Sequence, residues 1–417
     1  MPPIEHVELA SPAFKANPYP FYARLRAEAP VHRVRLPAKQ VAWLVTRYDD
    51  VASVLKDDRF VKEKRKVLSP EQAARQPWIP GVFRPLEQHM LDMDPPDHTR
   101  LRGLVHKAFT PRLIEDLRGR VQTLTDHLLN AAQRHGRMDL IRDYALPMPT
   151  TIIAEMLGIP AQDRQKFQRW SNTIVTAVPT TWGLLGAMPS MFAFLRYIRK
   201  LIRLRRSAPG DDLTSALVEA REAGDRFSED ELLGMISLLL IAGHETTVNL
   251  IGNGTLTLLQ HPESMDQLRD DPSLIKSAVE ELLRYNGPLE TATERFASED
   301  VTVAGVTIPR GEMVFAVVAS ANRDDRQFER PDELDLAREP NRHLAFGLGV
   351  HYCLGAPLAR LEGQIAINTL LRRVPDLRLA VPADRLRWRP GLVLHGLKAL
   401  PVTFARRSAA TLQNVSN

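Results

Sequence analysis

Over most of the chain, apolar residues recur at intervals of three and four, which is the spacing of amphipathic helices. This spacing dominates residues 94–270. A typical run is Leu113, Ile114, Leu117, Val121, Leu124 and Leu128. Residues 20–28 and 356–373 have the same pattern on either side of this region. The hydrophobic pattern therefore predicts a protein built mainly from helices.

Shorter strand-like runs lie near both ends of the chain. Residues 41–46 form one such run, and residues 290–318 form several, broken at Gly305, Pro309 and Gly311. The tail after residue 373 again reads as strands and turns. No repeat and no Gly/Ser-rich linker divides the 417 residues. We therefore expect a mainly α fold with a minor β part, forming one domain over residues 1–417.

Composition and charge narrow the class of protein. Apolar residues make up 44% and charged residues 25% of the chain, as in ordinary globular proteins. The 55 basic and 50 acidic residues are interleaved, so we expect no nucleic-acid binding. The densest basic runs, residues 62–66 and 196–206, are interpreted as solvated surface. The N-terminus lacks a signal-peptide pattern, and the longest apolar stretch, residues 232–243, is too short to span a bilayer. These features predict a cytoplasmic protein without membrane insertion.

The chain has a single cysteine, Cys353, which excludes an intramolecular disulfide. It lies in a loop with three glycines directly before a helical pattern, so that backbone N–H groups are expected to lower the pKa of the thiol. A thiolate held in this way suits a soft metal centre. The alternative from these residues alone is a structural cysteine in a glycine-rich turn.

The run Phe346-Gly347-x-Gly-x-His351-x-Cys353-Leu-Gly355 resembles the haem-binding loop of cytochromes P450. The resemblance implies the P450 fold, with haem b (iron protoporphyrin IX) between an oxygen-activation helix and the helix after the cysteine. It also implies that Cys353 is the iron ligand and that Phe346, Gly347 and Gly355 shape its loop. The resemblance extends from about residue 18 to residue 404.

Cationic side chains for the two haem propionates come from separate segments. His98 and Arg102 are four residues apart on a predicted helix, a pair that by itself is common at protein surfaces. In the context of the resemblance, His98, Arg102, Arg295 and His351 are the expected propionate ligands.

The segment Ala242-Gly243-His244-Glu245-Thr246 follows the longest apolar stretch. Gly243 lacks a side chain where a group can approach the helix, and Thr246 can bond back to a preceding carbonyl and open the helix. Without context, Glu-Thr is a polar helix face. The segment resembles the P450 oxygen-activation motif, which implies that Ala242 and Gly243 border the haem, Thr246 stabilises bound dioxygen and Glu245 supports proton delivery.

A further motif is structural. Glu281 and Arg284 are spaced as an ion pair on one helix and resemble the family's Glu-x-x-Arg, with Arg338 as the expected third member. Asp325 and Leu334 stand where Pro and Phe are more usual in the family, and we expect these departures to leave the chemistry unaffected.

The implied activity is a monooxygenase that hydroxylates or epoxidises a lipophilic small molecule with dioxygen. Electrons are expected from a separate ferredoxin or flavodoxin with its reductase, because no fused reductase domain is recognised, and the protein is expected to be a monomer. Charge predicts a docking face for that partner at Arg102, Lys107, Arg112 and Arg360.

Substrate contacts are expected, by analogy alone, from residues 78–93, 170–194, 289–293 and 393–394, with Leu239 and Ala242. Apolar candidates within them are Trp78, Phe83, Trp182, Met188 and Met191, although such residues also build cores. Two alternatives stay open: a peroxide-using or rearranging haem-thiolate enzyme, against which Glu245 and Thr246 argue, and a haem-based sensor or carrier.

Overall fold

The computed structural model describes residues 8–36, 41–74, 80–176, 181–222 and 227–406. Its secondary structure is mainly helical, as the hydrophobic pattern predicts. The helices are α1 (Pro12–Ala16), α2 (Tyr19–Glu28), α3 (Tyr48–Lys56), α4 (Pro70–Ala74), α5 (Asp97–Ala108), α6 (Pro111–Asp116), α7 (Arg118–Gln133), α8 (Pro147–Met156), α9 (Arg164–Thr176), α10 (Thr181–Ser207), α11 (Leu213–Glu222), α12 (Glu229–Gln260), α13 (Pro262–Asp270), α14 (Ile275–Asn286), α15 (Val318–Ala321) and α16 (Ala356–Arg373).

The strands form small sheets beside the helices. They are β1 (Val31–Arg35), β2 (Val41–Val45), β3 (Phe60–Val61), β4 (Arg137–Asp139), β5 (Arg295–Ala297), β6 (Val301–Val303), β7 (Val306–Ile308), β8 (Met313–Ala316), β9 (Arg378–Leu379) and β10 (Pro401–Thr403). The largest sheet has the order β1-β2-β8-β5-β3, in which only β2 and β8 are parallel. The others are β4-β10-β9 and the hairpin β6-β7. Pairing of β3 with β5 brings residues 60–62 beside Arg295.

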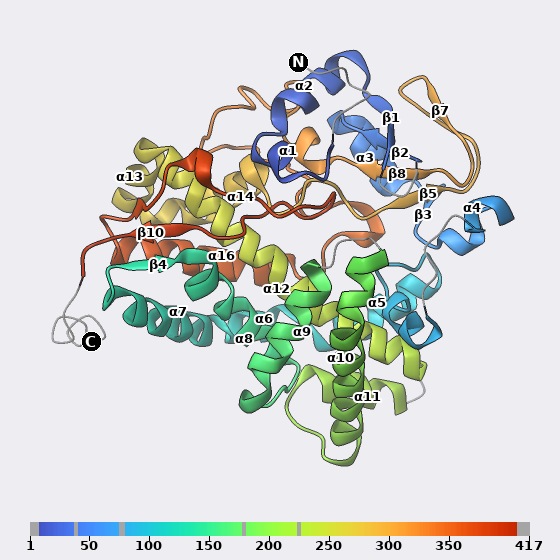
Figure 1. The fold of residues 1–417 in the computed structure, drawn as a ribbon, viewed down its shortest axis with the longest axis horizontal. Helices are drawn as coiled ribbons and strands as arrows, with labels where there is room; N and C mark the ends of the chain where they lie inside the picture. Colours follow the sequence, from blue (N-terminus) through green and yellow to red (C-terminus); the bar gives the residue numbers. More distant parts are fainter. Residues whose placement is uncertain (1–7, 37–40, 75–79, 177–180, 223–226, 407–417) are drawn as a thin grey trace.

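Helix α12 runs through the middle of the molecule, with α8, α14 and α16 packed around it (Figure 1). It begins at a capping box in which Ser228 accepts from the Glu231 N–H and Glu231 accepts from the Ser228 N–H. Its length and hydropathy would allow it to cross a membrane, but 72% of its most apolar window is buried inside the protein. The helix extends well beyond the apolar stretch 232–243, and we interpret it as the core helix.

A buried ion-pair network fixes the segment between α15 and the cysteine loop. Arg284 forms two hydrogen bonds of 2.7 and 2.8 Å with Glu281, and both side chains are inaccessible to solvent. Arg338 donates to both oxygens of the same carboxylate at 3.2 Å, and Asn341 donates at 3.1 Å. The structure thus joins the three residues that the sequence grouped, and adds Asn341.

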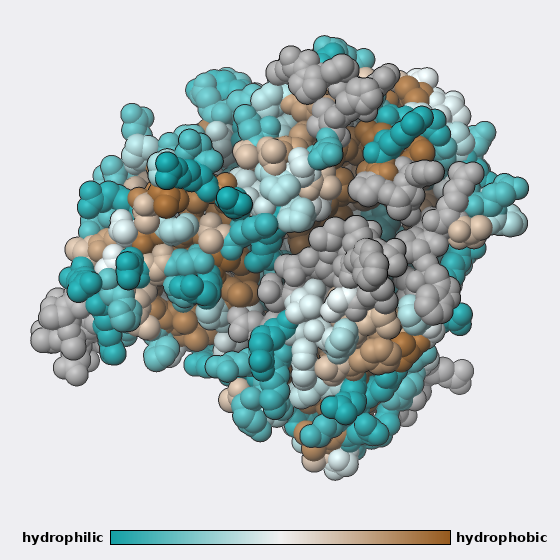
Figure 2. All heavy atoms as spheres, in the orientation of Figure 1, coloured by the Kyte–Doolittle hydropathy of each residue, from teal (hydrophilic) through white to brown (hydrophobic). Residues whose placement is uncertain are grey.

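On the face shown in Figure 2, the described surface is mostly hydrophilic, with several hydrophobic patches. The two basic runs behave differently from each other. Most cations of residues 196–206 are exposed, as expected, although Arg205 is held in an ion pair with Asp212. Lys62 of the first run is buried, so its interpretation as solvated surface was wrong.

Candidate active site

The cysteine loop is a tight turn held by its own backbone. The Cys353 N–H donates to the Phe346 carbonyl at 2.9 Å. Gly347 and Gly349 have φ values of 70° and 73°, a region that favours glycine. A Cβ on Gly349 would lie 2.8 Å from the Leu55 carbonyl oxygen, whereas a Cβ on Gly347 would have space. The loop is therefore built around glycine at both positions and rests on the end of α3.

The Cys353 side chain reaches accessible space just before α16. Surrounding protein still raises the pKa of the thiol by burial, while the N–H groups of Gly355 and Ala356 and the charge of Arg102 act in the opposite direction. Desolvation thus outweighs the expected lowering of this pKa by the helix N-terminus.

The four predicted propionate ligands, two arginines and two histidines, come together on one side of this loop. The rings of His98 and His351 lie 4.4 Å apart, centroid to centroid. Arg102 donates to the Tyr352 carbonyl at 2.8 Å. Burial, together with the charges of Arg295, His98, Lys62 and Arg102, lowers the pKa of His351 to about 2. Burial also lowers the pKa of Arg295 to about 10.

Lys62 is a fifth cation of this cluster that sequence reasoning missed. Its ammonium donates to the Thr293 hydroxyl at 2.7 Å and to the Glu294 carbonyl at 2.6 Å. Burial lowers its pKa to about 8. No local signal distinguishes Lys62 from the rest of its basic run, because the pairing of β3 with β5 places it there.

No carboxylate among the described residues forms a hydrogen bond or ion pair with the side chains of this cluster, although Glu294, Asp92 and Asp94 act on Lys62 electrostatically. Both ring nitrogens of His98 and the Nε of Arg295 are buried without a hydrogen-bond partner. The carboxylate of Asp94, which acts on His98 and Arg295 electrostatically, already accepts the backbone N–H groups of Lys62 and Glu63. Buried donors and cations without an anion fit the carboxylates of a bound group, as haem propionates would supply.

The middle of α12 presents the predicted oxygen-activation residues. Ala242 is exposed although the residues around 232–240 and 247–258 are buried, so the fold leaves open space beside it. Thr246 Oγ1 donates to the Ala242 carbonyl at 3.1 Å, as predicted, but α12 is continuous there. The close approach at Gly243 comes from Ile153 of α8, since a Cβ would lie 3.0 Å from its Cγ1.

Glu245 is buried and forms an ion pair with Arg389 from the segment between α16 and β10. Its second carboxylate oxygen, Oε2, is buried without a hydrogen-bond partner. Sequence reasoning missed Arg389, because nothing in the surrounding residues links it to a position 144 residues away.

The predicted substrate contacts are only partly within the described residues. Phe83 is buried, and Met188 and Met191 pack against the main hydrophobic core. Residue 78 and the side chain of residue 182 lie outside the described part of the chain. In the predicted partner face, Arg360 forms hydrogen bonds of 2.7 Å to both oxygens of Glu280, so its charge is largely neutralised.

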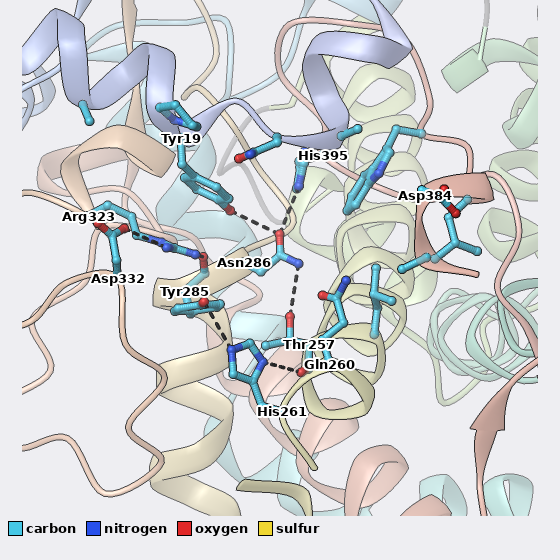
Figure 3. A pocket seen from close by; sticks show the side chains of 18 residues that line it. Tyr19, Thr257, Gln260, His261, Tyr285, Asn286, Arg323, Asp332, Asp384 and His395 are labelled. Atoms are coloured by element: carbon cyan, nitrogen blue, oxygen red, sulfur yellow. Dashed lines mark hydrogen bonds and ion pairs between the residues drawn. The ribbon is translucent and has the colours of Figure 1, made fainter. Parts of the chain in front are cut away.

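A cavity of about 570 Å³ lies elsewhere, between α2, the C-terminal ends of α12 and α14, and residues 383–395 (Figure 3). Its floor is a hydrogen-bond network in which Asn286 accepts from Tyr19 at 3.2 Å and donates to Thr257 at 3.1 Å. His395 also contacts the Asn286 oxygen, at 3.0 Å. These polar groups mostly contact one another, although His395 Nδ1 is buried without a hydrogen-bond partner, and we interpret the network as a structural junction.

Comparisons with known proteins show the family of this chain. A sequence model of the family "Cytochrome P450" matches residues 6–375. The chain is 46% identical to cytochrome P450 monooxygenase PikC of Streptomyces venezuelae, over 97% of this chain and 95% of that protein.

Solved structures give the same result. Myxobacterial cytochrome P450 CYP267B1, in complex with myristic acid, has a TM-score of 0.90 and 45% identity, covering 96% of this chain and 99% of that one. P450BioI, in complex with an acyl carrier protein ligated to hexadec-9Z-enoic acid, has a TM-score of 0.86 and 41% identity, covering 95% and 100%. P450 enzymes of this family use haem, redox partners and a substrate. By the family model over residues 6–375 and by relatives that are 46% identical over nearly the whole chain, this chain belongs to the cytochrome P450 family of monooxygenases.

Proposed function

We propose that this protein hydroxylates or epoxidises a lipophilic small molecule, with haem b held between α12 and the cysteine loop. Cys353 is the iron ligand, within the loop shaped by Phe346, Gly347 and Gly355. The observation that carries the proposal is the buried cluster of cations beside Cys353, with unpartnered nitrogens on His98 and Arg295.

The chain's own residues then have distinct tasks. His98, Arg102, Arg295 and His351 bind the propionates, and Lys62, which directly follows β3, joins them. Bound haem supplies the activation of dioxygen by electrons and protons. Thr246, part-exposed on α12, orients a hydroxyl towards the open space beside Ala242. Glu245 lies next to Thr246 in the sequence and transfers protons there. Its carboxylate is oriented by the ion pair with Arg389.

The substrate class is supported by the relatives and by the apolar residues in the predicted substrate segments 78–93 and 170–194. CYP267B1 was solved with a fatty acid and P450BioI with a fatty acyl chain on a carrier protein. We propose a substrate with a long apolar part, either free or attached to a carrier. Ferredoxin or flavodoxin with its reductase supplies the electrons, and the enzyme works as a cytoplasmic monomer of one domain.

The decisive experiment is the reduced carbon monoxide difference spectrum of the haem-loaded protein. We expect the red-shifted band of thiolate-ligated haem for the wild type and its loss in Cys353→His. Val350→Ala, in the same loop but 45% exposed, is the matched control and should keep the band. An imidazole-type spectrum for the wild type would refute the proposal.

A further inference from the structure

A groove of about 520 Å³ runs between α9 and α10, which pack side by side (Figure 1). It lies outside the site described above. Residues from the two helices and the turn before α9 line it: Asp163, Lys166, Trp170, Ala193, Arg196, Tyr197, Lys200 and Arg203.

One rim of the groove is a row of cations without acidic partners. Arg196, Lys200 and Arg203 follow one another at helical spacing along α10, and all three are exposed. Among the described residues, their side chains have no ion pair or hydrogen bond. The next arginines along the helix differ, since Arg205 pairs with Asp212 at 2.6 Å and Arg206 with Glu229 at 3.3 Å. The row is therefore available to an external anion.

The floor of the groove is aromatic and its single acid is already engaged. The rings of Trp170 and Tyr197 lie 5.7 Å apart. Asp163 accepts from the Tyr197 hydroxyl at 3.3 Å and pairs with Lys166 at 3.2 Å. The groove thus offers excess positive charge above an amphipathic floor, a combination suited to an acidic protein helix with some apolar side chains.

The N-terminal end of the cationic row leads towards a predicted substrate segment. Phe192, one turn before Arg196 on α10, is 45% exposed. Its ring lies 4.9 Å from that of Phe83 in the segment 78–93. A partner seated along the row would therefore have an apolar contact at the end nearest that segment.

We propose that the α9–α10 groove docks an acidic helix of a carrier protein that presents the lipophilic substrate as a covalently attached chain. This inference rests on the proposed function and adds the surface by which the substrate is delivered. A concave groove with an aromatic floor favours a helix over a flat anionic membrane. The cations increase the association rate by steering, and the aromatic floor slows dissociation.

The test uses acyl carrier protein loaded with hexadecanoate, compared with free hexadecanoic acid, on the haem-loaded enzyme. Binding is measured by calorimetry at low ionic strength. In the triple variant Arg196→Glu, Lys200→Glu and Arg203→Glu, we expect carrier affinity to fall at least about tenfold, and affinity for the free acid to change by less than about twofold. Wild-type carrier affinity should fall as salt rises.

The matched control reverses three exposed arginines elsewhere, Arg310, Arg385 and Arg387, with the same change in net charge. It should keep carrier affinity within about twofold. Equal losses in both triple variants, or no loss in either, would overturn the proposal. The proposal is also overturned if the triple variant of Arg196, Lys200 and Arg203 loses binding to phosphatidylglycerol vesicles but keeps its affinity for the carrier protein. A normal carbon monoxide spectrum in the same samples separates these results from failure of the proposed function.

Discussion

Arg389, in the segment before β10, forms an ion pair with Glu245 in the middle of α12. Both side chains are largely buried, with exposed fractions of 15% and 3%. The pair fixes one oxygen of the carboxylate and leaves the other without a partner. The position of the acid beside Thr246 therefore depends on a residue 144 positions later in the chain.

Replacing Arg389 with Gln should leave Glu245 buried without its cation. We expect the free energy of unfolding to fall by about 3 kcal/mol, the cost of breaking a buried ion pair. The amount of product formed per reduced nicotinamide cofactor consumed should also fall, and more hydrogen peroxide should be released, because Glu245 is no longer oriented. Denaturant unfolding and peroxide assays measure the two effects. Arg387→Gln, two residues earlier and exposed, is the control and should change neither.

Glu362 on α16 is a buried acid, and burial raises its pKa to about 8 from 4.5. Between these pH values the unfolded chain releases a proton that the folded chain retains, so stability falls as pH rises. We expect this acid to cost the wild type about 4 kcal/mol at pH 8 relative to pH 4.5. Glu362→Gln should remove this part of the pH dependence. Its free energy of unfolding should exceed that of the wild type most at high pH. Parallel stability curves for the two proteins from pH 5.5 to 8 would contradict the prediction.

Lys15 of α1 and Glu290 form an ion pair that is almost inaccessible to solvent, and Tyr22 donates to the same carboxylate. Lys15→Met or Glu290→Gln alone should lower the free energy of unfolding by about 3–5 kcal/mol, because each leaves a buried partner uncompensated. The double variant should lose less than the sum of the two. A double-mutant cycle by denaturant unfolding checks this, and additive losses would show that the pair is not coupled.

Gly347 and Gly349 have similar positive φ values but different surroundings. Gly347→Ala should cost about 1 kcal/mol from backbone strain alone. Gly349→Ala should cost clearly more and lower haem content, because its Cβ would lie 2.8 Å from the Leu55 carbonyl oxygen. Thermal unfolding and the haem-to-protein ratio measure both effects. Equal behaviour of the two variants would show that the contact with α3 is unimportant.

Much of the fold follows from local pattern. The predicted helix at residues 356–373 is α16 with the same bounds, and the strand-like run 41–46 is β2. The interrupted run 290–318 became β5 to β8. These elements are predictable because helical and strand periodicities are properties of neighbouring residues. The pairing of the strands is less predictable, because β2 lies between β1 and β8, which are far apart in the chain.

The sequence by itself determined the cysteine loop, because its glycines and the single thiol lie within ten residues of one another and their spacing sets the backbone turn. It also predicted which residues have the chemistry for haem and proton transfer. Only the tertiary structure decided that Lys62 joins the cationic cluster and that Arg389 holds Glu245. It also decided that burial outweighs the helix N-terminus in setting the pKa of Cys353. Burial and long-range ion pairs depend on which distant segments pack together, and no local pattern of residues carries that information.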